Sequence, residues 1–303
     1  MILYYAPGGG LGHLTRARAF LHTMAFEGRA VILTPSPFAK DLRVMGGVEI
    51  VPIPEELASD LPRYKSWLRE LFDRLRPDAI YLDAFPVGII GEFCDFQFPA
   101  PVYHIARLLR WREYSNLMAG ARPSFQTTYR VEPLIEEQER FLRKHSLDLR
   151  SLDLRYPSVG DGMQNLIEGF SREGGSFWLI VHSGPDREIE ELIAFADEMI
   201  GVEGKNLLFE EGLAKIVLVA PQRPEHLPVR ISYCDIYPAS ALFPFADRII
   251  TACGFNAMRE TEPFRQKHRY IPFVRRYDDQ FLRASRRKRD PAGEQKSREA
   301  GGS

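Results

Sequence analysis

Residues 2–13, ILYYAPGGGLGH, place a short apolar run directly before a glycine-rich turn. An apolar run of this length, bounded by Pro7 and by glycines, is typical of a buried strand. The apolar residues of Leu14–Phe26 then recur at helical spacing, so a helix is expected after the turn. Strand, turn and helix in this order are the unit from which α/β proteins with parallel sheets are built.

The same alternation continues along the chain and starts again in its second half. In the first half we predict further strands at Ala30–Leu33, Val48–Pro52, Ala79–Leu82 and Pro101–Ile105. We also predict two further helices there, at Tyr64–Leu75 and Glu136–His145. In the second half we predict strands at Phe177–Val181, Lys215–Val219, Ile231–Ile236, Arg248–Thr251 and Tyr270–Phe273, and helices at Glu188–Met199 and Asn256–Phe264. The sequence therefore predicts an α/β protein with two Rossmann-like domains that face a cleft.

The division between these domains is expected at Pro157–Gly162, where Pro, Ser and Gly residues cluster. Residues 1–158 would form the N-terminal domain, and residues 159–285 the C-terminal domain. Residues 286–303 are polar and lack an apolar period, so we expect a disordered tail there.

Composition excludes several classes of protein. The chain has 303 residues with 40 Lys and Arg against 41 Asp and Glu, so no basic field for nucleic acid covers it. No apolar stretch is long enough for a spanning helix, and the N-terminus lacks the pattern of a signal peptide. The three cysteines, Cys94, Cys234 and Cys253, are too far apart for a disulfide framework or a zinc site. We expect a cytoplasmic protein, with contact at the inner face of the membrane as an option.

The glycine turn before His13 does not match the usual nucleotide-binding motifs. His13 occupies the place of the third glycine in the dinucleotide fingerprint, and no Gly-Lys-Ser/Thr follows as in a Walker A loop. Because a helix N-terminus offers unpaired N–H groups, we expect Gly10 and Gly12 to contact the substrate. His13 is a candidate general base near neutral pH, and the alternative is that it only lines the turn.

The most informative stretch of the second half is residues 246–284, ADRIITACGFNAMRETEPFRQKHRYIPFVRRYDDQFLRA. A predicted strand leads into the small-residue turn Ala252-Cys253-Gly254, and Glu260 follows six residues after Gly254. Asp279 and Gln280 come shortly after the strand that contains Pro272. This spacing resembles the donor-binding half of GT-B glycosyltransferases, in the MurG-like group that uses UDP-sugars such as UDP-GlcNAc.

The resemblance implies a role for each of these residues. The turn with Cys253, Gly254, Phe255 and Asn256 would hold the donor diphosphate, and Glu260 would bind the ribose. Further implied contacts are Ser183 and Gly184 to the donor phosphates, Tyr237 to the nucleobase, and Asp279 and Gln280 to the sugar hydroxyls. In the N-terminal half, the resemblance places His13 beside the acceptor.

Two N-terminal features were harder to assign. Asp83 directly follows the strand Ala79–Leu82, and it is either an acceptor-side base or, more commonly for such a residue, a helix cap. Arg107–Arg112 mixes basic and apolar residues, so we expect an amphipathic helix on the core, with contact to an anionic or lipid-linked acceptor as the alternative. No group of residues has convincing metal-ligand spacing.

These observations predict a glycosyltransferase that needs no metal or other cofactor. It would transfer a sugar from a UDP-sugar to the hydroxyl group of an unidentified acceptor. A lipid-linked or membrane-associated acceptor is one option. We expect no binding to nucleic acid. Helix N–H groups would stabilise the leaving diphosphate. Gly10–Arg16 also resembles nucleotide-sugar hydrolases, so hydrolysis is one alternative, and a non-catalytic nucleotide-sugar-binding or partner protein is another.

Overall fold

The computed structural model describes residues 1–157, 177–203 and 215–289, and these fall into two compact units. The first unit contains Met1–Pro157 together with Arg275–Asp279, and the second contains the described parts of 158–274 and 280–303. The chain thus enters the second unit after Pro157, rejoins the first for five residues, and then re-enters the second. Of the predicted boundary Pro157–Gly162, residues 158–162 lie outside the described residues. Residues 290–303 of the predicted tail lie outside them as well.

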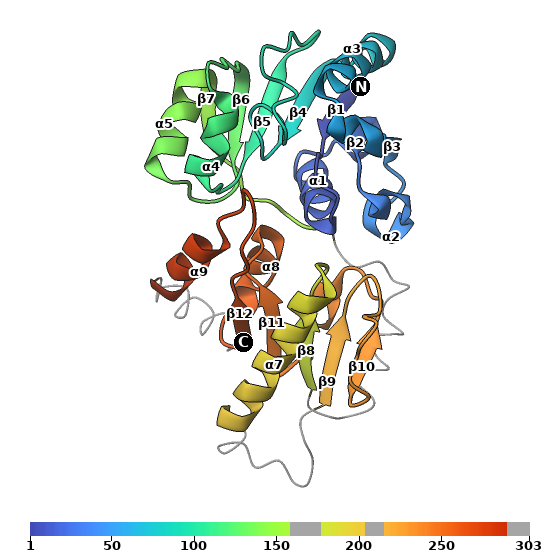
Figure 1. The fold of residues 1–303 in the computed structure, drawn as a ribbon, viewed down its shortest axis with the longest axis vertical. Coiled ribbons are helices and arrows are strands. Elements are labelled where there is room, and N and C mark those ends of the chain that lie inside the picture. Colours follow the sequence, from blue (N-terminus) through green and yellow to red (C-terminus); the bar gives the residue numbers. More distant parts are fainter. Residues whose placement is uncertain (158–176, 204–214, 290–303) are drawn as a thin grey trace. The chain divides into compact units, whose positions relative to one another are not determined.

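The first unit is built on a seven-stranded sheet in the order β3-β2-β1-β4-β5-β6-β7 (Figure 1), in which all strand pairs are parallel. Its strands are β1 (Ile2–Tyr5), β2 (Ala30–Thr34), β3 (Glu49–Pro52), β4 (Ala79–Asp83), β5 (Val102–Ala106), β6 (Phe125–Arg130) and β7 (Ser146–Ser151). Sequence order reverses between β1 and β4, and the carboxyl ends at such a switch point are where doubly wound sheets bind ligands.

The helices of this unit cover the sheet. They are α1 (Leu11–Thr23), α2 (Leu42–Met45), α3 (Leu61–Leu75), α4 (Trp111–Ser115) and α5 (Glu136–His145), with 3₁₀ turns at Glu27–Arg29, Pro37–Lys40, Glu55–Ser59 and Asn116–Met118. α3 shows why they form, because the Asp60 side chain caps its first turn by accepting from Arg63 N–H. Its apolar face, which includes Leu68 and Phe72, is buried in the same core as Leu3 and Tyr5 of β1.

Two strands and one extended stretch of this unit differ from the sequence predictions. β6 and β7 were not predicted, because β6 alternates polar residues and β7, at the sheet edge, is largely exposed. Arg107–Arg112 is not the expected amphipathic helix, since α4 begins only at Trp111. The backbone N–H groups of Leu108 and Leu109 instead donate to the side chains of Glu132 and Gln138. Such long-range partners leave no local pattern in the sequence.

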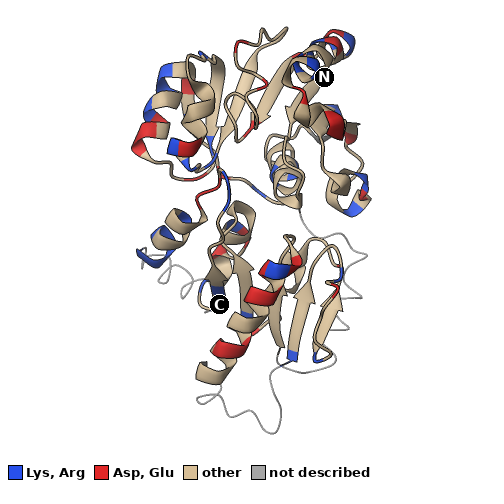
Figure 2. Ribbon diagram, in the orientation of Figure 1, with Lys and Arg blue, Asp and Glu red and all other residues tan. Residues whose placement is uncertain are grey.

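The second unit contains a five-stranded parallel sheet in the order β10-β9-β8-β11-β12 (Figure 1). Its elements are β8 (Phe177–Val181), α7 (Asp186–Glu203), β9 (Lys215–Val219), β10 (Ile231–Cys234), β11 (Arg248–Ala252), α8 (Phe255–Glu260), β12 (His268–Ile271) and α9 (Gln280–Arg289), with 3₁₀ turns at Ala239–Leu242 and Glu262–Phe264. Here the order reverses between β8 and β11. In both units the strands carry few charged residues, which lie mainly on helices and loops (Figure 2).

The core of this unit is divided by the sheet into two clusters. Trp178 and Ile180 of β8 pack with α7 residues such as Leu192, whereas Phe177 and Leu179 pack with Leu242. Alternate residues of a strand point to opposite faces, so a strand buried on both faces is apolar throughout, as β8 is.

Several boundaries of the second unit differ from expectation. β12 begins and ends two residues earlier than the predicted strand, and the helix predicted to reach Phe264 ends at Glu260, with Pro263 in the 3₁₀ turn that follows. α9 runs to Arg289, so the expectation of disorder is wrong for residues 286–289. α9 shows little apolar periodicity because two of its contacts are made by arginines, Arg283 with Cys253 O and Arg287 with Met258 O.

Candidate active site around His13 and Asp83

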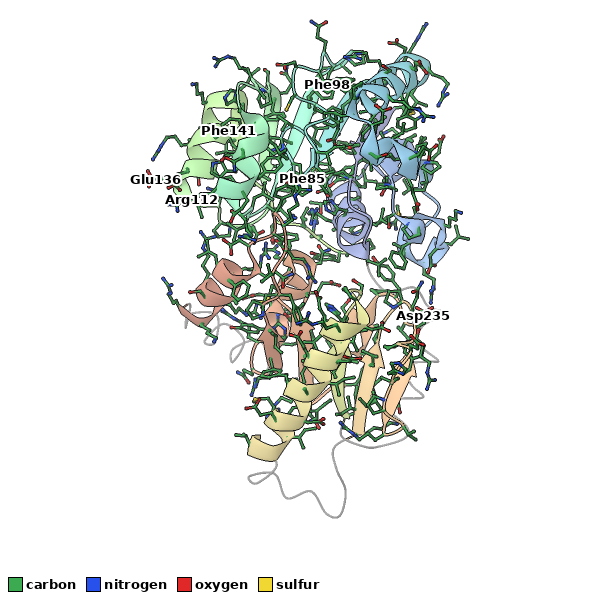
Figure 3. The ribbon with its side chains drawn as sticks, in the orientation of Figure 1. Phe85, Phe98, Arg112, Glu136, Phe141 and Asp235 are labelled. Carbon is green, nitrogen blue, oxygen red and sulfur yellow. The ribbon has the colours of Figure 1, made fainter. Side chains whose placement is uncertain are left out.

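His13 lies in the first turn of α1, directly after the glycine turn that follows β1. The N-cap of this helix is Gly10, and its first turn contains no acidic residue. A Cβ atom on Gly8 would lie 1.9 Å from His13 Cδ2, so only glycine lets the backbone pass this close to the ring. The imidazole also stacks on Phe85, with ring centroids 5.8 Å apart. Figure 3 labels Phe85 in the first unit.

Asp83 ends β4, the neighbour of β1 at the switch point, and its side chain is completely buried. Its Oδ2 lies 2.5 Å from His13 Nδ1, and Tyr4 donates its hydroxyl to Oδ1 at 3.1 Å. Arg16 donates to both oxygens, from Nε and Nη2, at 2.6 Å each. The capping interpretation of Asp83 is therefore wrong, because its carboxylate binds these three side chains and no helix follows it.

The charges in this cluster set the protonation of both groups. Burial alone would raise the pKa of the Asp83 carboxyl, but the Arg16 guanidinium and His13 hold it well below its usual range. Burial lowers the pKa of His13, Asp83 opposes this effect, and Arg16 and Arg107 add to the lowering. The imidazole is thus neutral near pH 7. With Nδ1–H donating to Asp83, the Nε2 lone pair is the proton acceptor.

The sequence proposed His13 and Asp83 separately, and the structure joins them across 70 positions of the chain. Sequence reasoning missed Arg16 and Tyr4. A signal for Arg16 was present, because it follows His13 by three residues and therefore shares its helix face among buried apolar positions. Tyr4 gave no comparable signal, since it reads as part of an apolar strand.

Arg107 lies beyond the end of β5, in the same unit, and is only 6% exposed. Its guanidinium carbon is 5.7 Å from the centre of the Phe85 ring that also packs on His13. Arg107 Nη1 donates to Asp278 Oδ1 at 2.5 Å. A second buried cation therefore borders the His13 site, with a carboxylate from the far end of the sequence as its partner.

The predicted donor-binding turns of the second unit also lie at a switch point. Ser183 and Gly184 follow β8, and Cys253 and Gly254 lie at the end of the neighbouring strand β11, so both turns share one sheet edge. Phe255 and Asn256 begin α8. Tyr237 follows β10, which is separated from β8 by β9, so it lies two strands away along the same edge.

Several of these residues have structural partners. Gly184 packs against the side chains of His182 and Glu188, whose Nε2 and Oε2 atoms are 2.7 Å apart, and a Cβ on Gly184 would lie 2.4 Å from His182 Nε2. This contact by itself requires a glycine. Cys253 and Phe255 are buried, whereas Ser183 is exposed.

Glu260, the predicted ribose ligand, ends α8. Burial raises the pKa of its carboxyl to about 7, and a hydrogen bond with Ser240 acts in the opposite direction. The carboxyl therefore changes charge near neutral pH. A group held in such a state at the edge of a sheet is a candidate for ligand binding.

The pair predicted to hold the sugar, Asp279 and Gln280, is divided between the two units. Gln280 is 4% exposed, and its Oε1 accepts the backbone N–H of Phe273 at 3.0 Å. This amide oxygen therefore fixes the end of the segment that follows β12. Asp279 is partly exposed and belongs to the first unit.

Among the residues that the structure describes, no group of three His, Cys, Asp or Glu side chains could hold a metal ion. None of the helices described is long and apolar enough to cross a membrane.

Comparison with known proteins identifies the fold of the chain. No protein-family model and no curated protein matches the sequence. A spinosyn forosaminyltransferase is similar in structure, with a TM-score of 0.56 at 14% identity over 94% of this chain and 82% of that chain. A Glycyrrhiza uralensis protein solved with glycyrrhetinic acid 3-O-monoglucuronide gives a TM-score of 0.56 at 13% identity over 94% and 79%. A spinosyn rhamnosyltransferase complexed with thymidine diphosphate gives 0.53 at 10% identity over 90% and 81%. With its two parallel sheets, the chain has the fold of the GT-B glycosyltransferases, as the sequence predicted.

Proposed function

We propose that the protein transfers a sugar from a nucleoside-diphosphate sugar to a hydroxyl acceptor, with His13 as the general base. The observation that carries this proposal is the buried His13–Asp83 pair at the switch point of the first sheet. Asp83 accepts Nδ1–H, which fixes the tautomer and leaves Nε2 to take the acceptor proton. Arg16 holds the carboxylate in place from two directions.

The reaction balances with these groups. The acceptor O–H proton moves to His13 Nε2, the acceptor oxygen forms a bond to the anomeric carbon, and the bond from that carbon to the diphosphate oxygen breaks with its electron pair. The imidazolium that forms is stabilised by Asp83, and part of this field is offset by the Arg16 cation. Asp83 raises the pKa of His13 and Arg16 lowers it, so the balance between these two effects sets how readily His13 takes the proton.

For the donor we propose a UDP-sugar, with UDP-GlcNAc as the first candidate. The resemblance of Gly254 and Glu260 to the MurG-like group supports this choice, and the thymidine diphosphate complex of a structural neighbour supports a nucleoside diphosphate more generally. The proposal needs no metal. A thermal-shift series with UDP, TDP, UDP-GlcNAc and NAD tests it, because a ligand that binds only the folded state raises Tm. A shift with NAD alone would overturn it.

Replacement of His13 tests the catalytic part. In His13→Ala, we expect turnover to fall by about 100-fold to 10,000-fold, while nucleoside-diphosphate affinity stays nearly unchanged. His22→Ala, which removes an exposed histidine from the same helix, is the matched control. Full activity in a folded His13→Ala protein would show that another group takes the proton.

Water is the second candidate acceptor. Gly10–Arg16 resembles nucleotide-sugar hydrolases, and two of its residues, His13 and Arg16, bind Asp83. NMR of a UDP-sugar incubated without an acceptor separates the reactions, since stoichiometric release of free sugar supports hydrolysis. Calorimetry that detects no nucleotide binding would instead favour a non-catalytic partner protein.

A further inference from the structure

The five residues Arg275–Asp279, called the return segment below, belong to the first unit although their neighbours on both sides belong to the second. They lie between β12 and α9. The backbone of this segment is fixed to the stretch that follows β5. Leu109 and Asp278 form an antiparallel bridge, and Arg110 N–H donates to Tyr277 O at 2.8 Å. The Arg110 side chain also donates to Arg275 O at 3.0 Å.

Two side chains of the return segment reach groups that border His13. Tyr277 is 6% exposed, and its ring meets Phe85 edge-on with centroids 5.8 Å apart. Phe85 in turn stacks on His13. Asp278 forms the ion pair with Arg107, the buried cation that also packs on Phe85. The segment thus contacts both the ring and the charge that surround the proposed base.

Both ends of the return segment are fixed within the second unit. Before it, the Phe273 N–H donates to the Gln280 side chain, which closes the base of the loop. After it, Arg283 of α9 donates to Cys253 O at 2.8 Å, in the turn that we propose for the donor diphosphate. The return segment is therefore held at its tip by residues of the first unit, while the residues on either side of it are held within the second unit.

We propose that Asp278 and Tyr277 are positioning residues for sugar transfer, which hold Phe85 and Arg107 against His13. The inference rests on the proposed function. Both residues act through other side chains and move no proton themselves. Asp278 compensates the buried charge of Arg107, and Tyr277 supports the ring on which the imidazole packs.

Asp278→Asn tests the inference, with Asp278→Glu as the conservative variant. We expect the turnover number of Asp278→Asn at saturating donor to fall by about tenfold to 100-fold, and UDP affinity measured by calorimetry to change less than about twofold. Asp278→Glu should recover most of the turnover. Glu113→Gln, which removes the exposed ion-pair partner of Arg110 on α4, is the matched control and should leave turnover unchanged.

Two readouts do not depend on activity. In Asp278→Asn the Arg107 cation loses its carboxylate, so the NMR titration midpoint of His13 should fall, and the amide of Arg110 should exchange faster because its acceptor is on the released segment. Turnover, His13 titration and Arg110 exchange all unchanged in a folded Asp278→Asn protein would overturn the inference. If the wild-type protein transfers no sugar, the proposed function fails, but the titration and the exchange still decide whether the segment acts on His13.

Discussion

At the scale of single residues, Arg16 lowers the pKa of the Asp83 carboxyl more than His13 does. It is 3% exposed and binds both oxygens of Asp83, and its Nη2 lies 3.2 Å from His13 Nδ1. A lone carboxylate beside a histidine would favour the imidazolium. Here burial, which is the larger effect, and the Arg16 cation both act against Asp83, so the pKa of His13 lies below its usual value and the imidazole is ready to accept a proton.

Replacement of Arg16 should separate its effect on His13 from its effect on the fold. Arg16 lowers the pKa of His13, so in Arg16→Met that pKa should rise, and the acidic limb of the kcat/KM profile should move to higher pH. Asp83 would also lose its buried cation, at a cost of about 3–5 kcal/mol in unfolding free energy. NMR titration of His13 and thermal unfolding measure the two effects.

Arg16→Lys keeps the charge and loses the two-point contact, so it should leave the His13 midpoint nearer to the wild-type value. Arg18→Met controls for the loss of an arginine from the same helix, since Arg18 donates to the Met45 carbonyl. A His13 midpoint that falls in Arg16→Met would contradict this account.

Glu260 gives a pH-dependent prediction for stability. Its folded pKa of about 7 lies above the ordinary value of 4.5, so ionisation is unfavourable in the folded state. The group therefore contributes stability below pH 4.5 that is lost as the pH rises through 7. At pH 8, Glu260→Gln should raise the free energy of unfolding by on the order of 2–3 kcal/mol, and Tm should rise with it. At pH 4, Tm should be unchanged.

Glu190→Gln, at an exposed position of α7, should show no such difference between pH 4 and pH 8. The same titration bears on the donor. An ionised Glu260 accepts ribose hydroxyls better than a protonated one, so UDP should bind more weakly at pH 6 than at pH 8. Equal Tm values for Glu260→Gln and wild type at pH 8 would show that the carboxyl is ionised without penalty.

At the scale of elements, α9 shows how an arginine-rich helix packs on a domain. Arg287 donates to Met258 O at 2.9 Å and to Thr261 O at 3.1 Å, carbonyls at the end of α8 and just beyond it. Carbonyls at a helix end lack partners within the helix, so these bonds complete α8. The apolar stems of the arginines supply contact area that the sequence pattern does not reveal.

Arg287→Ala should therefore destabilise the second unit by about 1–3 kcal/mol, because it removes hydrogen bonds to two carbonyls, Met258 O and Thr261 O. Hydrogen exchange of the α8 amides should become faster, and thermal unfolding should begin earlier. Arg289→Ala, which removes an exposed arginine bonded to Ser285, is the control. Equal stability of the two variants would show that α8 is completed by other donors.

The elements also show where sequence reasoning succeeds. β1, β2, β4, β8 and β9 were located within about one residue because each is buried on most of its length and therefore reads as a continuous apolar run. β6 and β7 are polar strands near a sheet edge, so the same criterion could not find them. α5 was found with both ends, since its acidic first turn and basic last turn follow the helix dipole.

At the scale of the whole molecule, the net charge of −1 gives the chain no overall basic field, so the proposed function assigns phosphate recognition to local groups. Two sheets with the same internal order, each with a switch point beside its first strand, provide two edges for ligands. One edge carries His13 and Asp83, and the other carries the turns after β8 and β11. Neither edge needs a basic surface.

The chain by itself determined the class of fold and several of the residues proposed for chemistry. Alternating apolar strands and helices specify two parallel sheets, and a glycine turn followed by His13 marks the first ligand edge, because these signals depend only on neighbours in sequence. Only the tertiary structure decided which charges meet. Asp83 binds both His13 and Arg16. Asp278 forms an ion pair with Arg107, and the Gln280 side chain accepts the backbone N–H of Phe273. Contacts of this kind join residues far apart along the chain, and burial rather than local pattern sets their strength.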